Sequence, residues 1–98
     1  VIVNTTAYNN NSGKSMGLTI YRDSSDLGNG TWGMINSYDT DTSGQRTIGQ
    51  PTSMSVLDSP SSTSQLTYQV YAKTESGGAT YFNYANIKAS ITAFEIAG

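Results

Sequence analysis

The chain has 98 residues, a mass of 10.4 kDa and a formal net charge of −2. It is short enough to form one domain, and its five Lys and Arg residues are scattered, which excludes the basic patch needed for nucleic-acid binding. Cys and His are absent, which excludes disulfides, Cys/His zinc sites and Ser-His or Cys-His nucleophile pairs. No apolar run is long enough to span a membrane, so we expect no membrane insertion.

Core-forming side chains are scarce. Leu, Ile, Val and Phe together number 17, but only 12% of residues are charged, so disorder is a poor interpretation. Seven Tyr and one Trp supply additional area for burial. A folded monomer of this mass exposes roughly 5,400 Å². A weakly charged β chain with so few aliphatic residues leads us to the hypothesis that one sheet face is buried against further copies of the chain.

The first third of the sequence predicts strands separated by polar turns. Val1–Ala7 begins in β-branched residues, and Ser15–Arg22 alternates between two faces. Between them, Tyr8–Lys14 is rich in Asn, Ser and Gly, which favour turns. Asp23–Asp26 is a second predicted turn, and Leu27–Ile35 is predicted to be a short strand broken by glycines. Because the sequence starts at Val1 without a Met, we expect it to be the C-terminal part of a longer protein.

The middle of the chain is more polar. We expect a long loop over Asn36–Gln50, a strand over Thr52–Leu57 and a turn over Asp58–Ser62. No segment repeats apolar residues at helical spacing for more than two turns, so no helix is predicted.

Three further strands are predicted in the last third. They are Leu66–Lys73, Ala79–Tyr84 and Ala89–Ile96, and their Tyr, Val, Thr, Phe and Ile residues suit a pleated surface. Gly77 and Gly78 supply the positive φ angles of a tight hairpin between the first two of these strands. Short strands at this spacing favour a single all-β domain over residues 1–98, an antiparallel β-sandwich or jelly roll.

One segment resembles part of a calcium loop. Asp39, Asp41 and Ser43 place oxygen ligands at alternate positions and are followed by a Gly, but the twelfth position is Gln50 rather than the bidentate Glu of an EF-hand. A polar surface turn explains the same residues. These three residues are therefore a weak candidate for a cation site, and no other cofactor is expected. The seven carboxylates lie mostly in turns and form no evident catalytic pair, so we expect no enzyme.

The tyrosines of the last strands have two possible uses. Tyr68 and Tyr71 are an odd number of residues apart and face opposite sides of their strand, as do Tyr81 and Tyr84, so one flat sugar-stacking platform does not use all four. Core packing or a subunit interface is the use that we favour.

Four segments carry a resemblance to a known family. They are Leu57–Ser64, Thr67–Tyr71, Gly77–Asn83 and Ala89–Ile96. They resemble the C-terminal region of tailed-bacteriophage structural proteins, notably fibre and decoration proteins of marine and cyanobacterial phages. There the pattern Leu-Asp-Ser-Pro, Thr-Tyr-x-Val, Gly-Gly-x-x-Tyr-x-Asn and Ser-Ile-Thr-x-x-Glu-Ile recurs near the chain terminus. The family is similar to trimeric jelly rolls of the tumour-necrosis-factor and complement type.

The resemblance implies a homotrimeric module on the surface of a virion, in a fibre or a capsid decoration. Its function would be assembly, particle stability or attachment to a host surface glycan or protein, and its partners would be its own copies and other virion proteins. The last strand of such folds lies near the three-fold axis, so the expected trimer interface contains Tyr68, Tyr71, Tyr81, Phe94 and Ile96. A carbohydrate-binding module, which predicts a monomer with coplanar aromatic side chains, and a bacterial surface adhesin domain, which predicts neighbouring copies in the gene, are the alternatives.

Overall fold

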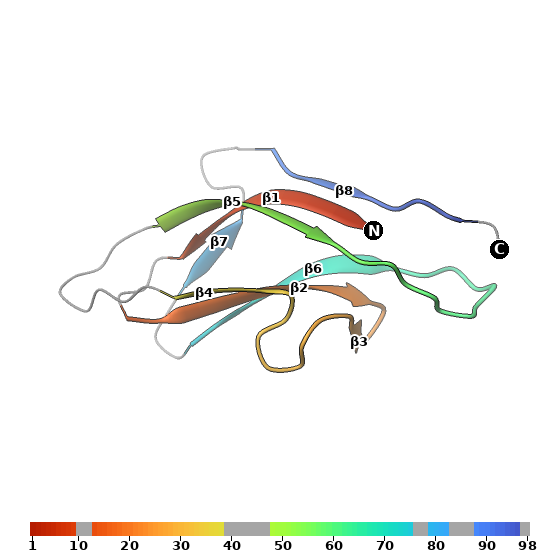
Figure 1. The fold of residues 1–98 in the computed structure, drawn as a ribbon, viewed down its shortest axis with the longest axis horizontal. Helices are drawn as coiled ribbons and strands as arrows, with labels where there is room; N and C mark the ends of the chain where they lie inside the picture. The colour runs from red at the N-terminus through yellow and green to blue at the C-terminus, as the bar shows by residue number, and fades with distance from the viewer. Residues whose placement is uncertain (10–12, 39–47, 76–78, 83–87, 97–98) are drawn as a thin grey trace.

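A computed structural model of the chain describes residues 1–9, 13–38, 48–75, 79–82 and 88–96. These residues form eight strands in two packed layers (Figure 1). The strands are β1 (Ile2–Asn9), β2 (Ser15–Arg22), β3 (Ser25–Asp26), β4 (Ile35–Tyr38), β5 (Ile48–Ser55), β6 (Tyr68–Thr74), β7 (Thr80–Phe82) and β8 (Ser90–Thr92). All the strand pairs are antiparallel. The prediction of an antiparallel all-β sandwich is confirmed.

Each sheet is built around one long central strand. In the first, here called the β1 sheet, β1 pairs along its whole length with β5, while β7 and β8 pair with opposite ends of its other edge. In the second, the β2 sheet, β6 follows one edge of β2, while β3 and β4 pair with opposite ends of the other edge. In both sheets, therefore, one edge of the central strand carries a long neighbour and the other carries two short strands.

The core lies between the two central strands. Alternate residues of β1 and β2 point inward, as the period of a strand requires, and Met54 of β5 joins them opposite Val3. The fully buried apolar residues are Val3, Ala7, Met16, Leu18, Ile20 and Met54. Partly buried hydrophobic side chains from the strand ends and connections pack around this cluster. The core is thus small, in keeping with the scarcity of aliphatic residues.

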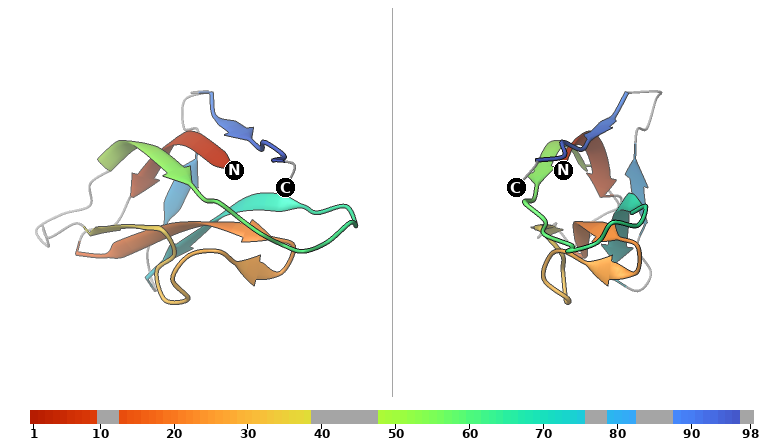
Figure 2. Two further views of the ribbon diagram at one scale, coloured as in Figure 1. Left: turned by 45° about the vertical axis from the view of Figure 1, so that its right-hand side comes forward. Right: turned by 90° about the vertical axis from the view of Figure 1, so that its right-hand side faces the viewer.

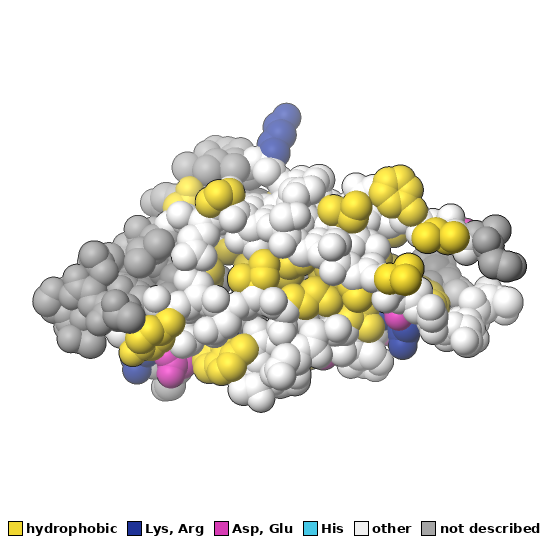
Figure 3. Space-filling view, viewed as in Figure 1, with side chains coloured by type: hydrophobic (Ala, Val, Ile, Leu, Met, Phe, Trp, Pro, Cys, Tyr) yellow, Lys and Arg dark blue, Asp and Glu magenta, His cyan; other side chains and the backbone are white. Residues whose placement is uncertain are grey.

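The two layers of the sandwich are seen end-on in Figure 2. Figure 3 shows hydrophobic side chains at the bottom of a hollow between them.

A polar cluster ties the connection between β5 and β6 to the end of β2. The Arg22 Nη1 group donates to Oδ1 of Asp58 at 2.6 Å, and the Tyr68 hydroxyl donates to Oδ2 of the same carboxylate at 2.8 Å. Nearby, the backbone N–H of Asp23 donates to the Thr67 carbonyl, and the Thr67 N–H donates to the Asp23 carboxylate. The connection is fixed at both ends by these contacts.

The cluster shifts the ionisation of two of its members. Burial by itself would raise the pKa of Asp58, but the hydrogen bonds from Tyr68 and Arg22 and the positive charge of Arg22 outweigh burial and lower this pKa below its ordinary value. The hydrogen bond to the Asp58 carboxylate, together with burial, raises the pKa of the Tyr68 hydroxyl. Both shifts favour the observed charge states, a carboxylate and a neutral phenol, at neutral pH.

Several predicted boundaries match the structure. The strand Ser15–Arg22 coincides with β2, and the first predicted strand corresponds to β1, which extends two residues further. The predicted strand Thr52–Leu57 overlaps β5, which begins earlier, at Ile48, and shortens the expected loop. The predicted turn over Asp23–Asp26 contains the two-residue strand β3.

Three predictions about strands are wrong. Most of Leu27–Ile35 is not a strand, because residues 28–33 cover the outer face of β2. Strand β4 begins only at Ile35, the last residue of that prediction, and continues into the expected loop Asn36–Gln50. Strands β6 and β7 belong to different sheets, so they do not form the predicted hairpin; Gly77 and Gly78 themselves lie outside the described residues. In the segment Ala89–Ile96, only β8 is a strand.

Candidate functional site

The outer face of the β2 sheet is partly covered by its own chain. Residues 27–34 run between β3 and β4, and backbone hydrogen bonds hold them to β2: Leu27 N–H donates to the Ile20 carbonyl, and Met34 N–H donates to the Leu18 carbonyl. Within this stretch, Asn29 and Gly33 exchange backbone hydrogen bonds of 2.9 and 2.7 Å. The covering segment is therefore a closed turn fastened to the central strand, and Thr19 is buried beneath it.

Two glycines allow the backbones to approach this closely. A methyl group on Gly17 of β2 would lie within contact distance of the Trp32 carbonyl oxygen. Gly33 has a φ of +82°, a conformation that other residues rarely adopt, and a side chain there would also meet the Leu18 carbonyl. These positions bring Trp32 close to the outer face of β2.

Aromatic side chains from three elements meet beside this segment. Tyr71 of β6 and Tyr21 of β2 are diagonal neighbours across the strand pair, because Thr19 is opposite Tyr71, and their ring centroids are 4.3 Å apart with planes inclined by 35°. Trp32 comes from the covering segment, and together they line a hollow of about 120 Å³. We call this hollow, lined by Tyr21, Asp26, Trp32, Tyr71 and Lys73, the aromatic cradle.

The two charged groups of the aromatic cradle have defined partners. Lys73 Nζ lies 5.0 Å from the centroid of the Trp32 ring and donates to the Thr31 carbonyl at 3.0 Å. Oδ1 of Asp26 accepts from the Thr19 hydroxyl at 2.6 Å and from the Gly28 N–H at 2.8 Å. Oδ2 of Asp26 accepts no hydrogen bond from the described residues. The aromatic cradle therefore contains one fixed ammonium group and one carboxylate oxygen available to a ligand.

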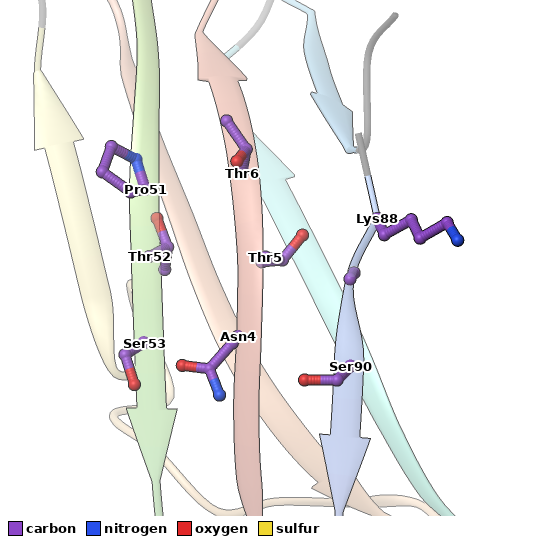
Figure 4. A pocket seen from close by; sticks show the side chains of 9 residues that line it. Asn4, Thr5, Thr6, Pro51, Thr52, Ser53, Lys88 and Ser90 are labelled. Atoms are coloured by element: carbon purple, nitrogen blue, oxygen red, sulfur yellow. The ribbon is translucent and has the colours of Figure 1, made fainter. Parts of the chain in front are cut away.

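A second hollow, of about 540 Å³, lies where β1, β5 and the residues just before β8 meet (Figure 4). Small polar residues line most of it: Asn4, Thr5, Thr6, Thr52, Ser53 and Ser90. Figure 4 shows the Lys88 side chain extending away from the strands. With neither an aromatic ring nor a charged group directed into it, this hollow has less means of orienting a ligand than the aromatic cradle has.

The C-terminal residues form a third feature. Ile91 of β8 is opposite Val3 and shares its inward side of the sheet, yet it is 49% exposed, whereas Val3 is 1% exposed. Beyond β8, Phe94 and Ile96 are 70% and 76% exposed. We call Ile91, Phe94 and Ile96 the C-terminal apolar segment. It is an apolar surface that the described part of the single chain does not cover.

The residues expected at a trimer interface are not all on one surface. Tyr68 packs against the core, Tyr71 lies in the aromatic cradle on the outer face of the β2 sheet, and Phe94 and Ile96 are in the C-terminal apolar segment. Nothing is described of the Tyr81 side chain. The opposite facing of Tyr68 and Tyr71, predicted from their odd spacing, is confirmed.

The weak calcium candidate, Asp39, Asp41 and Ser43, lies outside the described residues. Across the ranges that the structure describes, no group of three or more acidic residues is arranged to hold a metal ion. The same ranges contain no helix of the length and apolarity needed to cross a membrane.

Sequence reasoning missed most of the aromatic cradle. Trp32 was expected in a strand, and Tyr21, Asp26 and Lys73 were not singled out. The identical parity of Gly17, Thr19 and Tyr21 along β2 places them on one face, but only the register with β6 shows that Tyr71 and Lys73 join them.

Comparisons of the chain with protein-family models, with curated proteins and with solved structures give no match.

Proposed function

We propose that this chain is a non-catalytic structural module of a phage virion surface, where copies of it assemble as trimers through the C-terminal apolar segment. The resemblance of its last 42 residues to phage fibre and decoration proteins suggests the setting. The observation that carries the assembly proposal is the exposure of Ile91, Phe94 and Ile96 in the single chain.

The position of Ile91 suggests that a partner covers this residue and that it is not an ordinary surface residue. Ile91 is on the same side of the β1 sheet as Val3, which is the side that faces the other sheet. In a sandwich, side chains on this side are normally buried. Scattered exposed hydrophobic residues are common on proteins, but here a half-exposed inward residue is followed closely by two exposed hydrophobic side chains. Figure 3 shows hydrophobic side chains gathered at the end of the molecule that holds the C-terminus. Several exposed hydrophobic side chains gathered at one end of a molecule are typical of an interaction surface.

The edge of β8 offers a way for copies to join. Within the described residues, β8 pairs with β1 on one side and with no strand on its other side. An unpaired edge exposes backbone N–H and C=O groups that can pair with another chain. By contrast, β5 has Pro51, which lacks an N–H group, among its edge residues. We infer that the free edge of β8 in one copy contacts a different surface of the next copy, as a three-fold ring requires, with the C-terminal apolar segment packed in that contact.

Light scattering coupled to size-exclusion chromatography tests this proposal. At micromolar concentration we expect the chain to elute with the mass of three copies, and we expect a Phe94→Ser, Ile96→Ser double variant to elute as a monomer. The control is Tyr38→Ser, which removes another exposed hydrophobic side chain, at the end of β4, and should leave the trimer intact. A monomeric parent chain, or a double variant that stays assembled, contradicts the proposal.

A further inference from the structure

We propose that the aromatic cradle is a binding site for a single ring of a neutral sugar, such as the terminal residue of a glycan chain. This site goes beyond the assembly function and does not depend on it. The cradle is on the outer face of the β2 sheet, whereas the C-terminal apolar segment follows β8 of the other sheet.

The size of the cradle limits its ligand. Its volume of about 120 Å³ is well below the roughly 300–1,000 Å³ that is usual for sites enclosing drug-sized molecules. Exposed Tyr71, 46% accessible, forms one wall, and Trp32 lies among the other lining residues. One ring held against aromatic faces fits this space, while a longer chain would extend from it into solvent.

The aromatic faces suit a ligand with one apolar side. The face of a pyranose ring carries C–H groups, and its edge carries hydroxyl groups. Such a ring can lie flat against an aromatic side chain while its hydroxyls reach polar groups at the rim, as amphipathic ligands do in largely apolar sites. In the cradle, Tyr21 and Tyr71 supply two adjacent rings, inclined by 35° to each other, beside the Asp26 carboxylate and the Lys73 ammonium group.

A cationic ligand is disfavoured because the ammonium group of Lys73 already occupies the position beside the Trp32 ring. Aromatic cages bind quaternary ammonium groups through the electrons of their ring faces. Here, Lys73 Nζ already lies 5.0 Å from the Trp32 centroid and is held there by a hydrogen bond to the Thr31 carbonyl. A second cation in the cradle would be repelled by this ammonium group.

An acidic sugar is disfavoured by Asp26. Its carboxylate is held in the cradle by the Thr19 hydroxyl and the Gly28 N–H, both donating to Oδ1, so it cannot easily turn away. Oδ2 remains an acceptor for a ligand hydroxyl, and a carboxylate accepts stronger hydrogen bonds than a neutral group does. The ligand that satisfies both charged groups is therefore a neutral donor and acceptor, which is what adjacent sugar hydroxyls provide.

The single Trp of the chain gives a direct assay, because all indole fluorescence comes from the cradle. We would titrate the full chain with the methyl glycosides of glucose, galactose and mannose and with N-acetylglucosamine. We expect at least one of them to change the emission of Trp32 with a Kd on the order of millimolar, as befits a small, shallow site. Glucuronate, choline and AMP serve as acidic, cationic and nucleotide probes and should bind at least about tenfold more weakly.

Variants at exposed Tyr71 separate binding from folding. We expect Tyr71→Ala to raise the Kd by about tenfold, as loss of a stacking aromatic anchor does, and Tyr71→Phe to restore binding. Tyr38→Ala, at an exposed tyrosine outside the cradle, is the matched control and should bind like the parent chain. The thermal melting of each variant shows that it is folded.

Three results overturn the sugar site: no response to any neutral sugar, a preference for glucuronate, choline or AMP, or unchanged binding by folded Tyr71→Ala. The mass of the assembly, measured separately, tests the trimer and not this site.

Discussion

The Asp58 carboxylate offers the sharpest test of how the chain is held together. It accepts hydrogen bonds from both Arg22 and Tyr68, and its side chain is 10% exposed while that of Arg22 is 24% exposed. Replacing Asp58 by Asn keeps the shape of the side chain but removes its charge. We expect the variant to be folded and less stable.

The loss of stability follows from the two hydrogen bonds. A hydrogen bond between charged groups contributes roughly 1.5–3 kcal/mol, and the partial exposure of Arg22 reduces this to about 1 kcal/mol. The bond from the neutral Tyr68 hydroxyl contributes about 1 kcal/mol. The asparagine amide keeps one acceptor oxygen and places an NH2 group where the other was, so only one bond is lost outright and the other loses its charge. The free energy of unfolding should therefore fall by about 1–2 kcal/mol, which for a domain of this size lowers the Tm by roughly 4–16 °C.

The dependence on pH identifies charge as the cause. The pKa of Asp58 is lower in the folded protein than its ordinary value of 3.8. The stabilisation of the folded state by the Asp58 carboxylate is therefore fully present above pH 3.8 and is lost as the pH falls through the folded-state pKa. The free energy of unfolding, measured in urea, should be lower for Asp58→Asn than for the parent chain by the full amount at pH 7 and pH 5. This difference should disappear as the pH falls below 3.8.

Gln65→Ala is the control, since it changes an exposed side chain of the same connection and should change stability by less than about 0.5 kcal/mol. If Asp58→Asn is as stable as this control at pH 7, the carboxylate does not hold the connection in place. If the difference in stability between the parent chain and Asp58→Asn persists unchanged in acid, the shape of the side chain rather than its charge explains the difference.

Three further predictions concern the core, the covering segment and the phenol. Leu18→Ala should lower the free energy of unfolding by about 3 kcal/mol in urea titrations, since Leu18 is fully buried, and a loss below about 1 kcal/mol would contradict this packing. Gly17→Ala should cost about 1–3 kcal/mol and shift Trp32 emission, whereas Gly30→Ala, which meets no neighbouring atom, should do neither; equal effects would refute the close approach. Because the pKa of Tyr68 is raised above its ordinary 10.0, the stabilisation that its neutral hydroxyl provides is present below pH 10 and is lost above it. The free energy of unfolding of the parent chain, measured from pH 8 to 11, should therefore fall above pH 10, and Tyr68→Phe should abolish this fall.

The alternating pattern of the sequence was sufficient to locate β1, β2 and β6 and the second half of β5. In β2, Met16, Leu18 and Ile20 recur every second residue and form the core of the folded domain. This works because a strand with one face in the core must repeat with period two. The absence of Cys and His likewise excludes whole classes of catalytic and metal sites without a structure.

The pairing of strands was not predictable in the same way. The Gly77-Gly78 pair predicts a reversal of the chain, but a glycine pair is compatible both with a hairpin within one sheet and with a connection between two sheets. The sequence predicts a strand over Leu27–Ile35, because the tertiary role of this glycine-rich segment, covering the outer face of β2, leaves no periodic signal. Side chains that meet through such a covering segment, as Trp32 and Tyr71 do, come together only once the register is fixed.

By itself, the sequence determined an all-β sandwich with a small core, low charge and no common catalytic constellation, because periodicity and composition are properties of each segment alone. Only the tertiary structure decided which strands are neighbours, which tyrosine faces the aromatic cradle, and that Ile91 points inward yet remains half-exposed. The physical reason is that these properties depend on contacts between residues far apart in the chain, whose free energies are set by the register and packing of the whole sandwich.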